Sequence, residues 1–157
     1  MKQFRKVAVG GTFDELHRGH KTLLMKAFEI GDHVVIGLSS DALASKMHKP
    51  HITASYLERL AGLEVFLNSL SLWKNAEVEA LNDPYGSSIK DSSIEALVVS
   101  KETRPIALKI NDVRSEAELP PLIIVAVNMV PSQNCTPIST TRIRKGEMDT
   151  EGRLLKA

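Results

Sequence analysis

Two glycines and two histidines near the amino end have types and a spacing suited to phosphate chemistry. Gly10 and Gly11 end a short apolar run, and His17 and His20 stand at the start of an apolar-periodic segment. A phosphate can approach the N–H groups of Gly10 and Gly11 closely, because glycine has no Cβ. His17 and His20 would face the same way on a first helical turn, where unpaired N–H groups and the helix dipole favour an anion. The stretch therefore predicts a strand, a glycine turn and a helix start that bind phosphate.

Two common phosphate-binding motifs are excluded in this stretch. Gly-x-Gly-x-x-Gly is absent, and the run from Gly19 to Thr22 is not a Walker A loop, because a histidine separates the glycine from Lys-Thr. For either histidine alone, a surface position on an ordinary capped helix remains an alternative. We expect no metal site, because no cysteine or carboxylate joins the nearby histidines at ligand spacing. The histidines concerned are His17, His20, His48 and His51.

Composition describes an ordinary globular chain. Its 157 residues are 43% hydrophobic and 25% charged, with a formal net charge of +1, and suit a single domain over 1–157. The charge indicates no nucleic-acid partner, and no apolar run reaches the length of a membrane span. The amino end is too short and polar for a signal peptide, and the single Cys135 cannot form an internal disulfide. We therefore expect a cytoplasmic protein that interacts with neither nucleic acid nor membrane.

Apolar runs and helical periodicity alternate along the chain. This predicts an α/β fold, a Rossmann-like doubly wound sheet of about five parallel strands with helices on both faces. The continuous apolar first run predicts a central strand. In the longest helix a leucine stripe should face the core, while Glu58 and Arg59 should form a solvated pair. The expected strands are 6–10, 33–38, 77–81, 95–99 and 122–127, and the expected helices are 19–30, 53–70 and 106–116.

Polar residues follow several of the expected strands, at the edge where open α/β sheets bind ligands. A basic loop over 42–51 follows the second strand, a turn over 82–86 follows the third, and further cations follow the fourth. A solvated loop and a plain turn are the competing interpretations of the first two. The candidate residues are Lys46, Lys49, Asp83, Tyr85, Lys101 and Arg104.

A second cluster of hydroxyl and basic side chains lies near the other end of the chain. Ser139, Thr140 and Thr141 precede Arg144 in a predicted helical turn. Hydroxyls and N–H groups at a helix start bind phosphate, and arginine adds a charged fork. A capping sequence on a basic surface helix explains the same pattern, so the segment alone leaves both interpretations open.

These two clusters together resemble the signatures of one family. Gly-Thr-Phe-Asp followed by His-x-Gly-His, and Ile-Ser-Thr-Thr-x-x-Arg from Ile138 to Arg144, resemble those of the HIGH-motif, cytidylyltransferase-like nucleotidyltransferases. The central segments 83–86 and 98–114 are similar to archaeal-type phosphopantetheine adenylyltransferases, so the resemblance covers nearly the whole chain. The presence of His17 departs from the bacterial members, and the basic loop aligns ambiguously with theirs.

The resemblance implies transfer of AMP from ATP to 4′-phosphopantetheine, which gives dephospho-coenzyme A and pyrophosphate in coenzyme A biosynthesis, with Mg²⁺ bridging the phosphates. An FAD synthetase, a glycerol-phosphate cytidylyltransferase and a non-catalytic nucleotide-binding module are the alternatives. The oligomeric state is undetermined. His20 and Lys46 would be catalytic. The implied ATP-binding residues are Gly10, Gly11, Thr12, Phe13, His17, His20, Lys101, Arg104, Ser139, Thr140, Thr141 and Arg144. The implied acceptor-binding residues are Thr12, Lys46, Lys49, Asp83, Tyr85 and Lys101.

Overall fold

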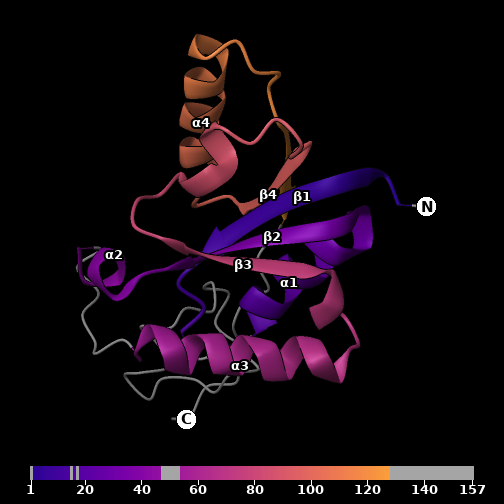
Figure 1. The fold of residues 1–157 in the computed structure, drawn as a ribbon, viewed down its shortest axis with the longest axis vertical. Helices are drawn as coiled ribbons and strands as arrows, with labels where there is room; N and C mark the ends of the chain where they lie inside the picture. Colours follow the sequence, from indigo (N-terminus) through magenta and orange to yellow (C-terminus); the bar gives the residue numbers. More distant parts are fainter. Residues whose placement is uncertain (1, 15, 17, 47–53, 128–157) are drawn as a thin grey trace, which may run out of the picture.

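One parallel five-stranded sheet organises the molecule (Figure 1). The computed structural model describes residues 2–14, 16, 18–46 and 54–127. The strand order is β3-β2-β1-β4-β5, and every neighbouring pair is parallel. This arrangement confirms the predicted doubly wound α/β fold. The strands are β1 (Phe4–Gly11), β2 (Gly31–Ser39), β3 (Ala76–Leu81), β4 (Ala96–Ser100) and β5 (Ile123–Val127).

The central position predicted for the first strand is confirmed. β1 pairs with β2 on one side and with β4 on the other. Its residues Val7, Ala8 and Val9 are all at most 5% exposed, so both faces of the strand are covered. Burial on both faces is the physical reason why this run is continuously apolar instead of alternating.

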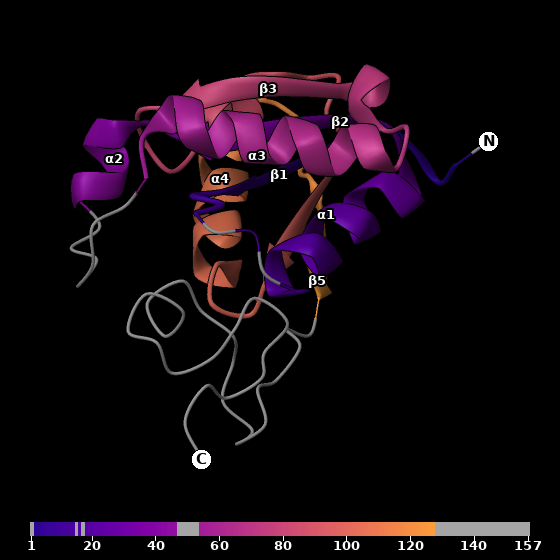
Figure 2. The same ribbon diagram turned by 90° about the horizontal axis from the view of Figure 1, so that it is seen from below.

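Helices cover both faces of the sheet, as predicted (Figures 1 and 2). Side chains of α1 (Arg18–Ile30) and α3 (Tyr56–Ser69) pack in one cluster with Val7 and Val9. Side chains of α4 (Arg104–Glu116) pack in a second cluster with Ala8 on the opposite face. Successive residues of a strand point to opposite faces, so the three residues of one strand serve two cores.

The connection from α1 to β2 is tighter than expected. The helix ends at Ile30 and the strand begins at Gly31, two residues before the predicted start. A Cβ at Gly31 would lie 2.7 Å from the side chain of Val7. Glycine therefore lets the chain enter the sheet directly against the central strand.

The segment after β2 begins as a helix, where the sequence suggested a polar loop. The short α2 (Asp41–Lys46) follows Ser40, whose hydroxyl accepts a hydrogen bond of 3.1 Å from the N–H of Leu43. Serine before a helix satisfies one of the N–H groups that have no intrahelical partner. This cap makes the first part of the predicted basic loop helical.

The inner face of α3 differs from the predicted leucine stripe. Leu63 and Leu67 are fully buried, but Leu57 is 73% exposed. Arg59 occupies the inner position and is only 3% exposed, so the prediction of a solvated Arg59 is wrong. The reason is helical geometry: positions 59, 63 and 67 recur at four-residue spacing and share one face. Glu58 is exposed as predicted, and the Ser55 hydroxyl caps the helix by accepting the N–H of Glu58.

The remaining elements lie within about two residues of their predicted ranges. Two short 3-10 helices, η1 (Trp73–Asn75) and η2 (Gly86–Ile89), flank β3. α4 begins at Arg104, two residues before the predicted start, because Pro105 suits a first helical turn. Within the described ranges, no helix is long and apolar enough to cross a membrane.

Candidate active site

Those predicted substrate-binding residues that the structure describes lie at or just beyond one edge of the sheet. The strands are parallel, so their carboxyl ends Gly11, Ser39, Leu81 and Ser100 all lie at this edge. From β1 the chain first continues to β2 and β3 on one side, and only later to β4 and β5 on the other side. Open α/β folds bind ligands in the crevice at such a switch in strand order. Thr12 and Phe13 directly follow β1, and Lys46 ends α2. Asp83 and Tyr85 follow β3, and Lys101 and Arg104 follow β4.

The loop after β1 has a defined, constrained conformation. Phe13 is 1% exposed and has a φ of 50°, in the left-handed region that non-glycine residues rarely adopt. Asp14 is also 1% exposed, and its Oδ1 accepts a hydrogen bond of 3.3 Å from the N–H of Ala54. The Gly-Thr-Phe-Asp segment is therefore held by the sheet on one side and by the chain before α3 on the other.

His20 lies on the first turn of α1, beside this loop. Its ring and that of Phe13 have centroids 5.4 Å apart and planes inclined at 69°, an edge-to-face contact. The half-buried imidazole is thus placed against a fixed aromatic ring. His17, the other predicted histidine, lies outside the described residues.

An apolar cavity of about 300 Å³ opens on the α4 side of the same strand ends. Gly10 and Gly11 line it, and Gly11 also begins the Gly-Thr-Phe-Asp segment (residues 11–14), named the phosphate loop after its predicted role. Among the residues that line it in the described part of the chain, none is a lysine or an arginine. Apolar walls with a few polar groups are typical of small-molecule pockets. Its apolar walls include Leu81, Tyr85, Ile106, Ala107 and Ile110.

The turn after β3 shapes one wall of this cavity. The Oδ1 of Asp83 accepts hydrogen bonds from the N–H groups of Tyr85 at 2.8 Å and Gly86 at 2.9 Å. Tyr85 lines the cavity, and Gly86 has a φ of 55°, which favours glycine. Asp83 was predicted to bind the acceptor; the contacts found for it are those of a residue that holds the turn, while Tyr85 is the member that reaches the cavity.

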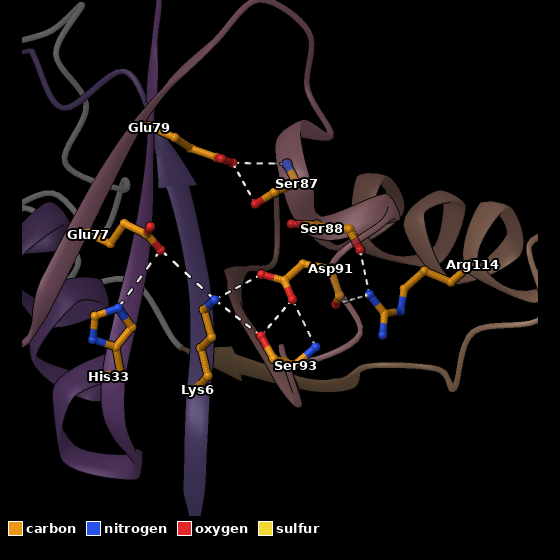
Figure 3. Close-up of polar contacts among 9 residues, drawn as sticks. All are labelled: Lys6, His33, Glu77, Glu79, Ser87, Ser88, Asp91, Ser93 and Arg114. Atoms are coloured by element: carbon orange, nitrogen blue, oxygen red, sulfur yellow. Dashed lines mark hydrogen bonds and ion pairs between the residues drawn. The ribbon is translucent and has the colours of Figure 1, made fainter.

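Side chains from β3 and α4 hold the η2 segment that follows this turn (Figure 3). Oε1 of Glu79 accepts hydrogen bonds of 2.9 Å from both the N–H and the hydroxyl of Ser87. Nη1 of Arg114 donates to the carbonyl oxygens of Ser88 at 2.8 Å and Asp91 at 3.0 Å. Burial lowers the pKa of the Arg114 guanidinium, and the Asp91 carboxylate opposes that shift.

An ion pair ties the same segment to the central strand (Figure 3). Nζ of Lys6 lies 2.8 Å from Oδ2 of Asp91, and the Ser93 hydroxyl donates to the other oxygen of that carboxylate at 2.6 Å. The hydrogen bond from Lys6, followed by that from Ser93, lowers the pKa of Asp91 to about 2. The cavity wall is therefore anchored to β1.

The predicted cations are less closely grouped. Lys46, Lys101 and Arg104 are exposed at the carboxyl edge, after different strands, and none of them lines the cavity. Their positions allow them to meet phosphates that extend beyond the strand ends. Several further predictions lie outside the described residues: Lys49, Ser139, Thr140, Thr141 and Arg144.

Two groups of residues were missed by sequence reasoning. The first is Arg59, which donates to the carbonyl oxygen of Thr12 in the phosphate loop. Its four-residue spacing from Leu63 and Leu67 indicates the inner face of α3, but the partners that allow a guanidinium to be buried there come from segments distant in sequence. The second group comprises Ile106 and Ile110, which line the cavity. Their four-residue spacing predicts one face of a helix, but the cavity that they line also needs the turn after β3, which is distant in sequence.

Comparison with known proteins identifies the family of the chain. The model of the cytidylyltransferase-like family matches residues 8–146, which include the phosphate loop and the second signature. The chain belongs to the cytidylyltransferase-like family. It is thus a nucleotidyltransferase, as the two signatures predicted.

Full-length relatives narrow the family further. A curated phosphopantetheine adenylyltransferase from Methanothermobacter thermautotrophicus is 41% identical over 157 residues, covering 99% of this chain and 92% of that protein. One from Methanosarcina mazei is 45% identical over 154 residues, covering 96% of this chain and 97% of that protein. A solved structure of a protein of unknown function from Archaeoglobus fulgidus superposes with a TM-score of 0.72 at 31% identity, covering 85% of this nucleotidyltransferase and 99% of that chain.

Proposed function

We propose that this nucleotidyltransferase is a phosphopantetheine adenylyltransferase, which transfers AMP from ATP to 4′-phosphopantetheine in coenzyme A biosynthesis. The observation that carries the proposal is the near-complete, 41–45% identical match to curated enzymes of that name. The phosphate loop beside a cavity of about 300 Å³ supports it, because the acceptor has a phosphate at one end and an uncharged arm behind it.

The reaction is an in-line displacement at the α-phosphorus of ATP. An oxygen of the acceptor phosphate forms a new bond to this phosphorus, while the bond to the bridging oxygen of pyrophosphate breaks and the electron pair leaves with pyrophosphate. No covalent enzyme intermediate is needed, so positioned cations and N–H donors carry the rate. His20 would stabilise the phosphates in the transition state, with Thr12 and the N–H groups of Gly10 and Gly11 beside it.

The acceptor would lie with its arm in the apolar cavity and its phosphate toward Thr12. Tyr85 and the isoleucines of α4 support this orientation, because they offer the apolar surface that an uncharged arm requires. Lys46 and Lys101 would neutralise charge at the exposed end. His17, Lys49 and the segment from Ser139 to Arg144 keep their predicted phosphate-binding roles.

Mg²⁺ would bind mainly through the triphosphate. Within the described residues, no group of three or more His, Cys, Asp or Glu side chains is placed to hold a metal. Mg²⁺ commonly keeps several waters and binds substrate phosphates instead of a cage of protein ligands. When bound, it would neutralise charge on the leaving pyrophosphate.

An acceptor screen tests the proposed function. The purified protein is incubated with Mg²⁺, with ATP or CTP, and with 4′-phosphopantetheine, FMN or glycerol phosphate, while pyrophosphate release is followed. We expect release only with ATP and 4′-phosphopantetheine together. Product with FMN or glycerol phosphate but not with phosphopantetheine would overturn the assignment. Tight ATP binding without pyrophosphate release from any acceptor would instead indicate a non-catalytic module.

A further inference from the structure

Arg59 is a buried cation that the proposed chemistry does not use. It lies in the first turns of α3, and its side chain is only 1% exposed. Burying a guanidinium removes it from water, which is unfavourable unless well-placed partners offset the lost hydration. The identity of those partners therefore indicates what this side chain does.

The guanidinium joins three chain segments at the carboxyl edge of the sheet. Nη1 donates to the carbonyl oxygens of Thr12 at 3.0 Å and of Ser39 at 2.7 Å. Nε donates to the carbonyl oxygen of Ala54 at 2.8 Å, and Nη2 lies 3.2 Å from Oδ1 of Asp41. The planar, rigid arginine fork can serve these acceptors together, whereas lysine has a single donor centre.

The contact with Thr12 restrains a strained part of the backbone. Phe13, the next residue, has a φ of 50°, an unfavourable conformation that persists only where the surroundings enforce it. The peptide bond between the two residues is trans, so the N–H of Phe13 points away from Arg59. The hydrogen bond from Arg59 thereby favours the peptide orientation seen in the structure.

Further hydrogen bonds connect the residue on the other side of Phe13 back to Arg59. Asp14 accepts the N–H of Ala54, and the carbonyl oxygen of that same Ala54 accepts Nε of Arg59. Phe13 is thus held between two tethered neighbours. Its own ring is 1% exposed and meets the ring of His20 in the edge-to-face contact.

We propose that Arg59 is a positioning residue for nucleotidyl transfer: by holding the Thr12–Phe13 peptide it fixes the Phe13 ring, which in turn orients the His20 imidazole toward the reacting phosphates. This inference rests on the proposed function for its kinetic consequence. The structural part of the inference, that Arg59 orients His20, does not depend on which acceptor the enzyme uses.

Steady-state kinetics test the consequence through a double-mutant cycle of Arg59→Met and His20→Ala. We expect Arg59→Met to lower kcat about 100-fold, the order of loss that accompanies a misplacement of about 1 Å, with both KM values changed less than about 3-fold. In the His20→Ala background the same change should lower kcat less than about 3-fold, because residues acting through one group are not additive. Arg59→Lys, which keeps a cation and one donor centre, should recover part of the loss.

Leu67→Ala is the matched control for stability. Leu67 occupies the same buried face of α3 as Arg59 and lies fully inside the core, about two helical turns further along. Its loss should lower the Tm substantially while leaving kcat unchanged. If Arg59→Met and Arg59→Lys affect kcat no more than Leu67→Ala does, or if their effects simply add to that of His20→Ala, the positioning role is overturned.

A spectroscopic measurement separates failure of this inference from failure of the proposed function. The imidazole C–H signals of His20, assigned by their loss in His20→Ala, should move in Arg59→Met because the ring current of Phe13 changes, and should stay in place in Leu67→Ala. Unmoved His20 signals in Arg59→Met and Arg59→Lys would overturn the inference even in an active enzyme. Absence of turnover in the wild-type protein with moved His20 signals would overturn the proposed function alone.

Discussion

The contact between Phe13 and His20 shows how a local motif becomes a site. The φ of 50° at Phe13 and its burial place the aromatic ring against the imidazole on the first turn of α1. A histidine on an exposed first turn would otherwise sample several rotamers. The ring contact reduces this freedom before substrate binds, which is what a preorganised donor requires.

Replacing His20 tests this donor directly. We expect His20→Ala to lower kcat by about 100-fold or more, the order found when one preorganised donor is removed, while the Tm stays close to that of the wild type. His33→Ala is the matched control, because His33 lies near the opposite end of β2, where its Nε2 is 3.8 Å from the exposed carboxylate of Glu77. Near-normal turnover in His20→Ala would contradict its role.

The Lys6–Asp91 ion pair makes stability depend on acidity. The pKa of Asp91 is lowered from 3.8 to about 2, so its stabilising contribution is complete above about pH 4 and is lost as the pH falls toward 2. Asp91→Asn should therefore lower the free energy of unfolding by about 1–2 kcal/mol at pH 7, after allowance for solvent screening, and by progressively less toward pH 2.

Urea unfolding followed by circular dichroism at pH 7, 4 and 2.5 measures this dependence. Asp112→Asn, which removes an exposed carboxylate from α4, is the control and should change stability by less than about 0.5 kcal/mol. A difference between wild type and Asp91→Asn that stays constant over this pH range would rule out the ion pair as its source.

At the scale of elements, the turn that follows β3 determines which side chains line the cavity. The η2 helix is held by Glu79, Arg114 and Lys6 through Asp91, and these residues come from β3, α4 and β1 (Figure 3). This helix begins at Gly86, whose N–H donates to the Asp83 carboxylate. The cavity wall is thus a product of several elements converging on one turn.

Gly86→Ala tests whether this turn controls the acceptor site. A Cβ at Gly86 would lie 2.6 Å from Oε1 of Glu79, and the φ of 55° is itself unfavourable for alanine. We expect a loss of about 1–3 kcal/mol in stability and an increase in KM for the acceptor, with KM for ATP little changed.

The matched variant is Gly62→Ala on α3. A Cβ there would meet no atom within 4 Å, so alanine should stabilise the helix by about 0.5–1 kcal/mol without altering either KM. Equal stability of Gly86→Ala and wild type would contradict the strained turn.

At the scale of the whole molecule, the central strand divides the site into two parts. α1 and the phosphate loop approach its carboxyl end from one face, and α4 with the apolar cavity approaches from the other. Gly10 and Gly11 lie between them without side chains. In the proposed reaction, the phosphate of the acceptor would meet the triphosphate of ATP across the end of this strand.

Filling the cavity should separate the two substrates kinetically. Ala107 is 1% exposed and lines the cavity, so Ala107→Leu should raise KM for 4′-phosphopantetheine about 10-fold while KM for ATP changes less than about 2-fold. Leu108→Ala, on the exposed face of the same helix, serves as control and should leave both values unchanged. A parallel rise in KM for ATP would contradict the division into two parts.

The sequence by itself determined the five strands, the three long helices, the central position of β1 and the strand–loop–helix unit that carries the first signature. These features are encoded in residues close together in the chain, through apolar continuity, helical periodicity and glycine placement. The tertiary structure alone decided the burial of Arg59, the conformation of Phe13 and the cavity. Arg59 and Thr12 lie 47 positions apart, and the cavity joins β1, the turn after β3, and α4. Which side chain loses water depends on contacts between distant segments, and local patterns carry no record of those contacts.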